Sequence, residues 1–233
     1  MNGFLSWIRQ LDFEYLLATL IVAAAAILCI TIHETCHGLM ALALGDDTAK
    51  RNKRLSLNPL RHIDLMGLVM IVLVRFGWAK PVPVDPRRFR RPKVGMMLTA
   101  FAGPVSNILL ALVARILWYV WFVFVPFERK LDTGFLYYIR YFLECVAVIS
   151  AGLAVFNLFP VPPLDGSKIL FAILPDRWYM SLMRYERYGM LVLVALLVSG
   201  VLDTSLLFLR SALIDGLDAM VQPLFYYVVN HLV

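Results

Sequence analysis

The sequence predicts an all-α integral membrane protein with about four transmembrane helices. Of the 233 residues, 61% are hydrophobic and only 16% are charged, and the mean hydropathy is +0.76. This composition is too apolar for a soluble domain, and long apolar runs alternate with short basic loops. We expect a single membrane-embedded domain over residues 1–233, with its functional core at about 15–170.

The first predicted span covers residues 15–44. It includes residues 16–32, an uncharged run that is 17 residues long. A helix of this length can cross the hydrocarbon core of a bilayer. The mixed residues 1–14 indicate an interfacial lead-in rather than a cleaved signal peptide.

The second predicted span covers residues 94–125, which is long for a single crossing. It contains Gly103-Pro104, a sequence that favours a local kink. It also contains Arg115, next to several aromatic residues. We expect the Arg115 side chain to extend towards the membrane surface beside an aromatic belt. The alternative is a functional role for Arg115.

The third and fourth predicted spans cover residues 135–159 and 189–209. Within the third, Arg140 and Glu144 are four residues apart and are expected to pair. Residues 210–233 are mixed in composition, which favours a tilted or interfacial helix.

The other apolar segments are too short to cross the bilayer. Residues 64–78 have basic flanks on both sides, which favours a re-entrant segment or a β-hairpin that starts and ends on one side. Residues 81–86 contain three prolines and should be extended. Residues 167–187 combine basic and aromatic side chains, which is typical of an amphipathic stretch on the cytoplasmic side.

The distribution of Lys and Arg predicts the topology. Fifteen lie in the segments 45–62, 80–93 and 167–187, whereas the segments on the opposite side contain four. Cytoplasmic loops are enriched in basic residues, so we expect these three segments in the cytoplasm and both ends of the chain outside. The basic pI of about 9.3 reflects this topology. No nucleic-acid-binding module is visible.

An HExxH motif, His33-Glu34-Thr35-Cys36-His37, lies inside the first predicted span. On a helix the two imidazoles leave the same face one turn apart, so they can share a zinc ion. The neighbouring carboxylate of Glu34 can then act as a general base on water. Ionisable residues are rare within a membrane and mark candidate functional sites. The alternative is a buried polar cluster that pairs helices.

Five short motifs follow one another within residues 30–170. They are His33-Glu34-Thr35-Cys36-His37, Asn58-Pro59-Leu60-Arg61-His62-Ile63-Asp64, Gly77-Trp78-Ala79-Lys80-Pro81-Val82-Pro83-Val84, Ala102-Gly103-Pro104-Val105-Ser106-Asn107, and Asn157 through Gly166. In this order they resemble the site-2 protease family of intramembrane zinc metalloproteases. The chain is similar to the minimal prokaryotic form, without the PDZ or CBS domains of larger members.

The resemblance implies that Asp165 is the third zinc ligand, beside His33 and His37. The residue types agree, because a catalytic zinc favours three protein ligands and an open fourth position. Asp165 also follows the proline-broken end of the third span, on the same side as the HExxH motif. The alternative is that Asp165 only caps the helix that follows it.

The resemblance also implies that Asn107 and Asn157 lie near the active centre. A buried amide can bind a substrate carbonyl or a developing oxyanion. The alternative for each is a hydrogen bond between helices, which is common for Asn in membrane spans. We favour the substrate role for Asn157 and leave both open for Asn107.

These observations predict a zinc endopeptidase that hydrolyses peptide bonds within or near transmembrane segments, in regulated intramembrane proteolysis or signal-peptide clearance. The implied partners are a transmembrane protein substrate and the bilayer, with no nucleic acid; a homo-oligomer is left open. We expect a multi-pass protein of a prokaryotic plasma membrane whose active site opens towards the cytoplasm.

One alternative is a non-proteolytic relative that binds membrane proteins. Another, a metal-ion transporter, predicts internal repeats, which the sequence lacks.

Overall fold

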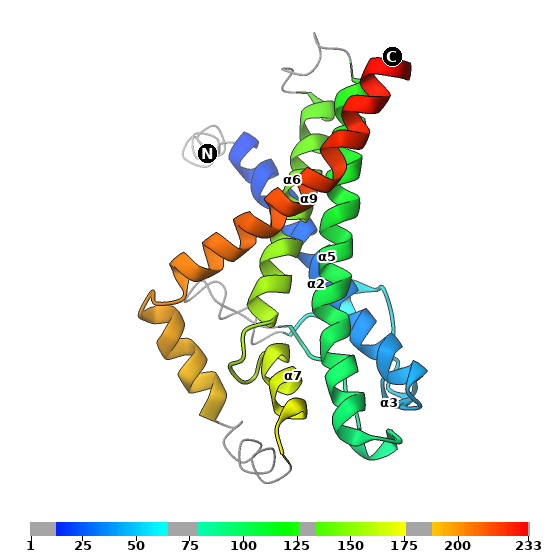
Figure 1. Ribbon diagram of the computed structural model, residues 1–233, viewed down its shortest axis with the longest axis vertical. Coiled ribbons are helices and arrows are strands. Elements are labelled where there is room, and N and C mark those ends of the chain that lie inside the picture. The colour runs from blue at the N-terminus through cyan, green and yellow to red at the C-terminus, as the bar shows by residue number, and fades with distance from the viewer. Residues whose placement is uncertain (1–12, 65–78, 126–133, 176–187, 233) are drawn as a thin grey trace, which may run out of the picture.

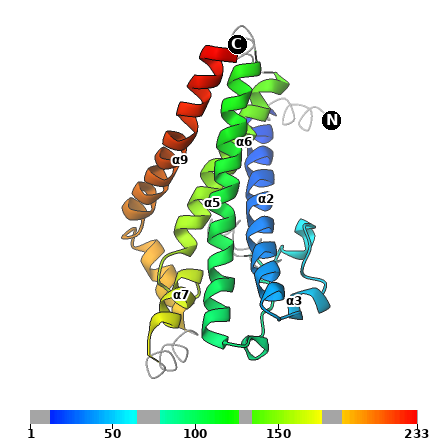
Figure 2. The ribbon, with the colours of Figure 1, turned by 45° about the vertical axis from the view of Figure 1, so that its right-hand side comes forward.

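The computed structural model describes residues 13–64, 79–125, 134–175 and 188–232. Three long helices form its centre: α2 (Phe13–Ala43), α5 (Pro92–Phe124) and α6 (Phe135–Asn157). Each contacts the other two, and Figures 1 and 2 show them side by side. All three are long and apolar enough to cross a membrane. Their ends agree with those of the first three predicted spans to within two residues.

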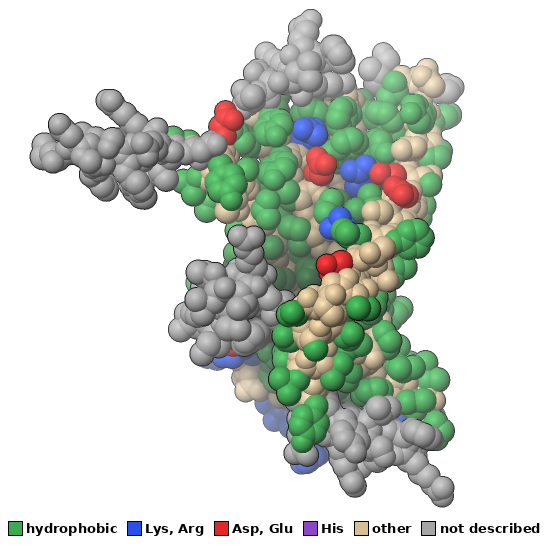
Figure 3. All heavy atoms as spheres, turned by 90° about the vertical axis from the view of Figure 1, so that its left-hand side faces the viewer, with side chains coloured by type: hydrophobic (Ala, Val, Ile, Leu, Met, Phe, Trp, Pro, Cys, Tyr) green, Lys and Arg blue, Asp and Glu red, His purple; other side chains and the backbone are tan. Residues whose placement is uncertain are grey.

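Small side chains fill the contacts between these helices. Ala25 and Cys29 of α2 pack against Ala114 of α5 and Ala147 of α6, and all four are almost fully buried. Small residues let helix backbones approach closely, which is how helices associate when the surrounding lipid is as apolar as the side chains. Larger hydrophobic side chains point outward, and they cover much of the face in Figure 3.

The C-terminal part of the chain differs from the prediction of a span at residues 189–209. A helical segment, Tyr188–Val198, ends in a turn, and α9 (Asp203–Leu232) starts at an angle of 87° to it. Gly200 makes this turn possible, because its φ of +70° lies in the left-handed region that other residues avoid. Helix α9 then runs back along α5 and α6 (Figure 2). The two helices of this bent pair form a fourth span only if together they make one crossing of the membrane.

An ion pair joins α9 to α5. The guanidinium of Arg115 donates two hydrogen bonds to the carboxylate of Asp218, with Nε 2.5 Å from Oδ1 and an Nη 2.7 Å from Oδ2. The same guanidinium lies 4.4 Å from the ring centroid of Trp118. The prediction that Arg115 extends to the membrane surface was therefore wrong. A partner 103 residues away, which no local pattern indicates, satisfies its charge instead.

Short elements gather at one end of the bundle. Helix α3 (Thr48–Arg51) follows α2, and α7 (Asp165–Ile173) follows α6; both lie at the lower end in Figures 1 and 2. Two 3-10 turns, η1 (Pro59–Arg61) and η2 (Pro86–Arg88), lie in the connection between α3 and α5. Of the predicted amphipathic stretch at residues 167–187, residues 167–173 form most of α7.

The predicted re-entrant segment or β-hairpin lies mostly outside the described residues. Its described flanks meet at an isolated antiparallel bridge between Ile63 and Ala79. Beyond this bridge, residues 80–85 contain neither helix nor strand, as the prolines predicted. The other described residues contain no strand, so the all-α class holds for the part of the chain that the structure describes.

The Arg115–Asp218 pair gives a first prediction. Replacing Arg115 with Leu leaves the Asp218 carboxylate uncompensated between helices, and we expect a loss of about 3–5 kcal/mol in the free energy of unfolding. The double variant Arg115→Leu/Asp218→Leu should lose less than either single variant, because it leaves no unpaired charge. Unfolding in mixed detergent micelles measures all three.

Arg140→Leu provides the control. Its ion pair with Glu144, at 3.4 Å, is more exposed, so removing it should change stability by about 1 kcal/mol or less. Additive losses in the double variant would show that Arg115 and Asp218 do not stabilise each other.

Candidate metal centre

His33 and His37 lie one turn apart on α2, in its half nearer α3. Both are buried, and their Nε2 atoms are 3.0 Å apart. The two rings stand almost perpendicular, with centroids 4.5 Å apart. The helical spacing of the HExxH motif therefore brings two imidazole nitrogens close enough to bind the same metal ion, as the sequence predicted.

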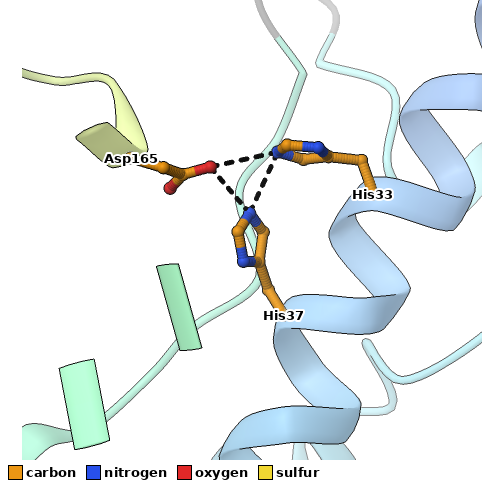
Figure 4. Close-up of side chains that lie close together, drawn as sticks. All are labelled: His33, His37 and Asp165. Atoms are coloured by element: carbon orange, nitrogen blue, oxygen red, sulfur yellow. Dashed lines mark hydrogen bonds and ion pairs between the residues drawn. The ribbon is translucent and has the colours of Figure 1, made fainter. Parts of the chain in front are cut away.

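Asp165 brings the third group to this point. Its Oδ2 lies 3.2 Å from Nε2 of His33 and 3.1 Å from Nε2 of His37, as Figure 4 shows. Asp165 is the first residue of α7, which begins after the proline-rich connection from α6. Within the described ranges, these three residues form the one group of His, Cys, Asp or Glu side chains that could hold a metal ion.

The donor set fits zinc. Zinc is bound tetrahedrally by nitrogen and oxygen at about 2.0–2.1 Å, so two of its ligand atoms lie roughly 3.3 Å apart. The three separations here, between 3.0 and 3.2 Å, are close to that length. Three protein ligands leave a fourth position open, which is the arrangement of a catalytic rather than a structural zinc.

Each of the three groups has a second partner. Nδ1 of His37 lies 2.6 Å from the carbonyl oxygen of Thr99, which can only accept, so this ring carries its proton on Nδ1 and keeps Nε2 free for a metal. Nδ1 of His33 lies 3.2 Å from Nδ2 of Asn107. The other carboxylate oxygen of Asp165, Oδ1, lies 3.7 Å from the ammonium of Lys168.

Asp165 is ionised in this setting. Burial alone would raise its pKa, but the two neighbouring imidazoles and the ammonium of Lys168 outweigh burial and hold the pKa well below its usual range. An ionised carboxylate is the form that binds a metal.

Glu34 is held by the extended segment that precedes η2. Its Oε2 accepts a hydrogen bond from the backbone N–H of Val82, at 2.9 Å. The guanidinium of Arg54 donates to the carbonyl oxygens of Lys80 and Pro81, which fixes this segment across the site. One carboxylate oxygen of Glu34 is thus oriented by backbone, which the sequence alone did not indicate.

A cavity of about 520 Å³ opens onto the centre. Its polar lining includes Glu34, Asn157, Lys168 and the three candidate ligands, and its walls are otherwise mostly apolar. Asn157 lines the cavity while its Nδ2 donates to the carbonyl oxygen of Leu153 in its own helix, at 3.0 Å. Asn107 is not part of the lining; it is fully buried beside His33.

The other polar residues that the sequence singled out lie elsewhere. His62 is buried in the loop after α3, with Nε2 2.7 Å from the carbonyl oxygen of Ser56. Arg140 and Glu144 pair on α6, as predicted. Lys168, by contrast, lines the cavity, and its position three residues after Asp165 places both on one side of a helix.

Gly103 allows α5 to approach the two imidazoles. A Cβ at this position would lie 2.4 Å from Nε2 of His37 and 2.6 Å from Cε1 of His33. The sequence suggested a kink at Gly103-Pro104, but α5 continues through both residues. The glycine is needed here for space beside the candidate ligands, a requirement that only the packed structure reveals.

The helices and the centre together define a membrane-embedded protein with a His/His/Asp metal site beside a carboxylate, an arrangement found in metallopeptidases. The family model described as "Peptidase family M50" matches residues 133–200, which include Asp165. The chain is 36% identical over 219 residues to "Putative zinc metalloprotease YwhC" of Bacillus subtilis (strain 168), covering 90% of this chain and 94% of that protein.

It is also 26% identical over 213 residues to "Putative zinc metalloprotease Rip2" of Mycolicibacterium smegmatis, covering 87% of this chain and 77% of that protein. No solved structure matches the chain. The chain belongs to peptidase family M50, the site-2 protease family of membrane-embedded zinc metalloproteases, and its metal is zinc. The resemblance in the sequence is thereby confirmed.

Asp165 gives the next prediction. In Asp165→Ala we expect the zinc content of the detergent-purified chain to fall from about one ion per chain to a small fraction, because two imidazoles alone leave the metal without its anionic ligand. Elemental analysis measures this without a substrate. Zinc at the wild-type level in Asp165→Ala would assign the third ligand to another residue.

Gly103→Ala should also lose zinc, because the new methyl group overlaps both imidazole rings. The matched control is Gly152→Ala on α6, where the nearest atom to a Cβ is the Cδ of Arg210 at 3.6 Å, an ordinary contact. Both variants are compared by zinc content and by elution on size exclusion. Normal zinc content in Gly103→Ala would show that α5 can move away from the imidazoles at little cost.

Proposed function

We propose that this protein is an intramembrane zinc endopeptidase that cleaves transmembrane segments of other membrane proteins. The observation that supports this most directly is the convergence of His33, His37 and Asp165 on one point beside Glu34 in a single cavity. The two histidines and Glu34 belong to a helix long enough to cross a membrane. A peptide bond cleaved here would therefore lie at membrane depth.

In this proposal His33, His37 and Asp165 hold the zinc ion, which when bound polarises the scissile carbonyl and acidifies water. Glu34 removes a proton from the attacking water and later delivers it to the leaving amine. The hydrogen bond from Val82 orients one oxygen of Glu34 and leaves the other for this transfer. Lys168 and Asn157 also line the cavity, where their N–H groups can bind the carbonyl oxygen of a substrate.

The cavity indicates the conformation of the substrate. Its walls are mostly apolar, and the residues that line one side belong to the extended stretch from Ala79 to Val84. A transmembrane helix unwound at its cleavage site would present unpaired backbone groups, which an extended neighbour can satisfy by pairing as a strand. We infer that the substrate binds as an extended segment next to residues 79–84.

Water and product would pass on the cytoplasmic side. Helix α2 ends at Ala43, ten residues beyond His33, which corresponds to about 15 Å along the helix axis. The loops at this end carry most of the basic residues, which favours the cytoplasm. Regulated intramembrane proteolysis and signal-peptide clearance are the two roles that such a site fits.

Glu34→Gln tests the mechanism. The variant should keep its zinc, because Glu34 is not one of the three converging groups, and should lose cleavage by a factor of about 100 or more, because an amide cannot accept the proton. The assay uses a panel of tagged single-span proteins in bilayer vesicles, with the fragments resolved on gels.

The matched control is Glu144→Gln, which removes a carboxylate that is paired with Arg140 and absent from the cavity lining. It should cleave at the wild-type rate. Cleavage retained by Glu34→Gln would remove Glu34 from the mechanism. Zinc bound by the wild type, with no cleavage of any test protein, would favour the non-proteolytic alternative.

A further inference from the structure

Asn107 on α5 is a fully buried polar residue next to the metal centre that the proposed mechanism does not use. Its Nδ2 lies 3.2 Å from Nδ1 of His33, the ring nitrogen that does not face Asp165. Its Oδ1 is buried and has no hydrogen-bond partner among the residues that the structure describes. Asn107 is not part of the cavity lining. Its amide therefore contacts the imidazole of His33 and does not face the space where a substrate would bind.

The two histidines differ in how their protons are fixed. His37 faces the carbonyl oxygen of Thr99, which can only accept a hydrogen bond, so its Nδ1 always carries a proton. His33 faces an amide, which can either donate through Nδ2 or accept through Oδ1. The partner of His33 is therefore compatible with a proton on either ring nitrogen.

Metal binding requires one of these two arrangements. In the structure, Nδ2 of Asn107 donates to Nδ1 of His33, which places the ring proton on Nε2, within 3.2 Å of Oδ2 of Asp165. A metal at Nε2 needs the lone pair of that nitrogen, so the proton must move to Nδ1, where it requires an acceptor. A half-turn of the amide exchanges Nδ2 with Oδ1, the atom that now has no partner.

We propose that Asn107 is a positioning residue for the metal site, whose side-chain amide turns so that Oδ1 accepts the Nδ1 proton of His33 when zinc is bound. In the metal-free site the same amide donates to His33 instead. This inference rests on the proposed role of His33 as a zinc ligand. It assigns Asn107 to the imidazole and not to the substrate.

Three variants test this on the full-length chain in detergent. Asn107→Leu is similar in size but has no acceptor, so its dissociation constant for zinc should rise about 10–100-fold. Asn107→Asp keeps an acceptor at the same place and adds a negative charge, so it should bind zinc at least as tightly as the wild type. Ser106→Ala removes the neighbouring buried hydroxyl, which bonds to the carbonyl oxygen of Gly103 in its own helix, and should leave the affinity unchanged.

Zinc affinity is measured by competition with a chelator of known strength, and no substrate is needed. A second measurement follows the imidazole N–H of His33 by NMR of zinc-loaded protein labelled at histidine nitrogen. This proton should exchange slowly with water in the wild type and in Asn107→Asp, and faster in Asn107→Leu. A purely structural role for Asn107 would lower the stability of Asn107→Leu without making this proton exchange faster.

The outcomes separate this inference from the proposed function. Unchanged zinc affinity in Asn107→Leu would overturn it, as would an affinity in Asn107→Asp more than 10-fold below that of the wild type. The aspartate result decides the question even if the leucine variant fails to fold. Absence of zinc from the reconstituted wild type would overturn this inference and the proposed function together, whereas a change confined to the Asn107 variants leaves the proposed function intact.

Discussion

The burial of ionisable groups inside an apolar helix bundle is the constraint on which this structure depends. Two imidazoles and a carboxylate lie within 3.2 Å of one another among helices that can cross a membrane. Such groups are costly at membrane depth unless they are paired or bind a metal. Thr99 and Asn107 on α5 and Lys168 on α7 supply each group with a second partner.

The bundle is shaped to make this possible. Helix α5 approaches the imidazoles because Gly103 has no side chain, and small residues keep α2, α5 and α6 close together. Lipid provides no hydrophobic force that presses helices together, so close packing and polar pairs must hold them. The ion pair between Arg115 and Asp218 is such a polar pair, and it attaches α9 to the bundle that carries the site.

The segment at residues 79–85 connects the loops between α3 and α5 to the centre. The backbone N–H of Val82 reaches Glu34, and the backbone N–H of Asp85 donates to the buried carboxylate of Asp46, just after α2. Acidic side chains on or just after α2 thus hold the segment at its middle and at its C-terminal end. Its prolines prevent it from folding into a helix, so its backbone groups stay available for contacts of this kind.

The sequence by itself determined the class of protein, the first three spans and the HExxH helix, because hydropathy and the spacing of His33 and His37 are local properties of the chain. Asp165 could be placed at the site only through the order of five motifs. The turn at Gly200, the ion pair of Arg115 with Asp218 and the contact of Val82 with Glu34 were decided by the tertiary structure. The two contacts depend on how segments far apart in sequence pack together. The turn depends on the angle between two successive helices. The same is true of Asn107, whose partner follows from how α5 packs against α2 and not from its position in a motif.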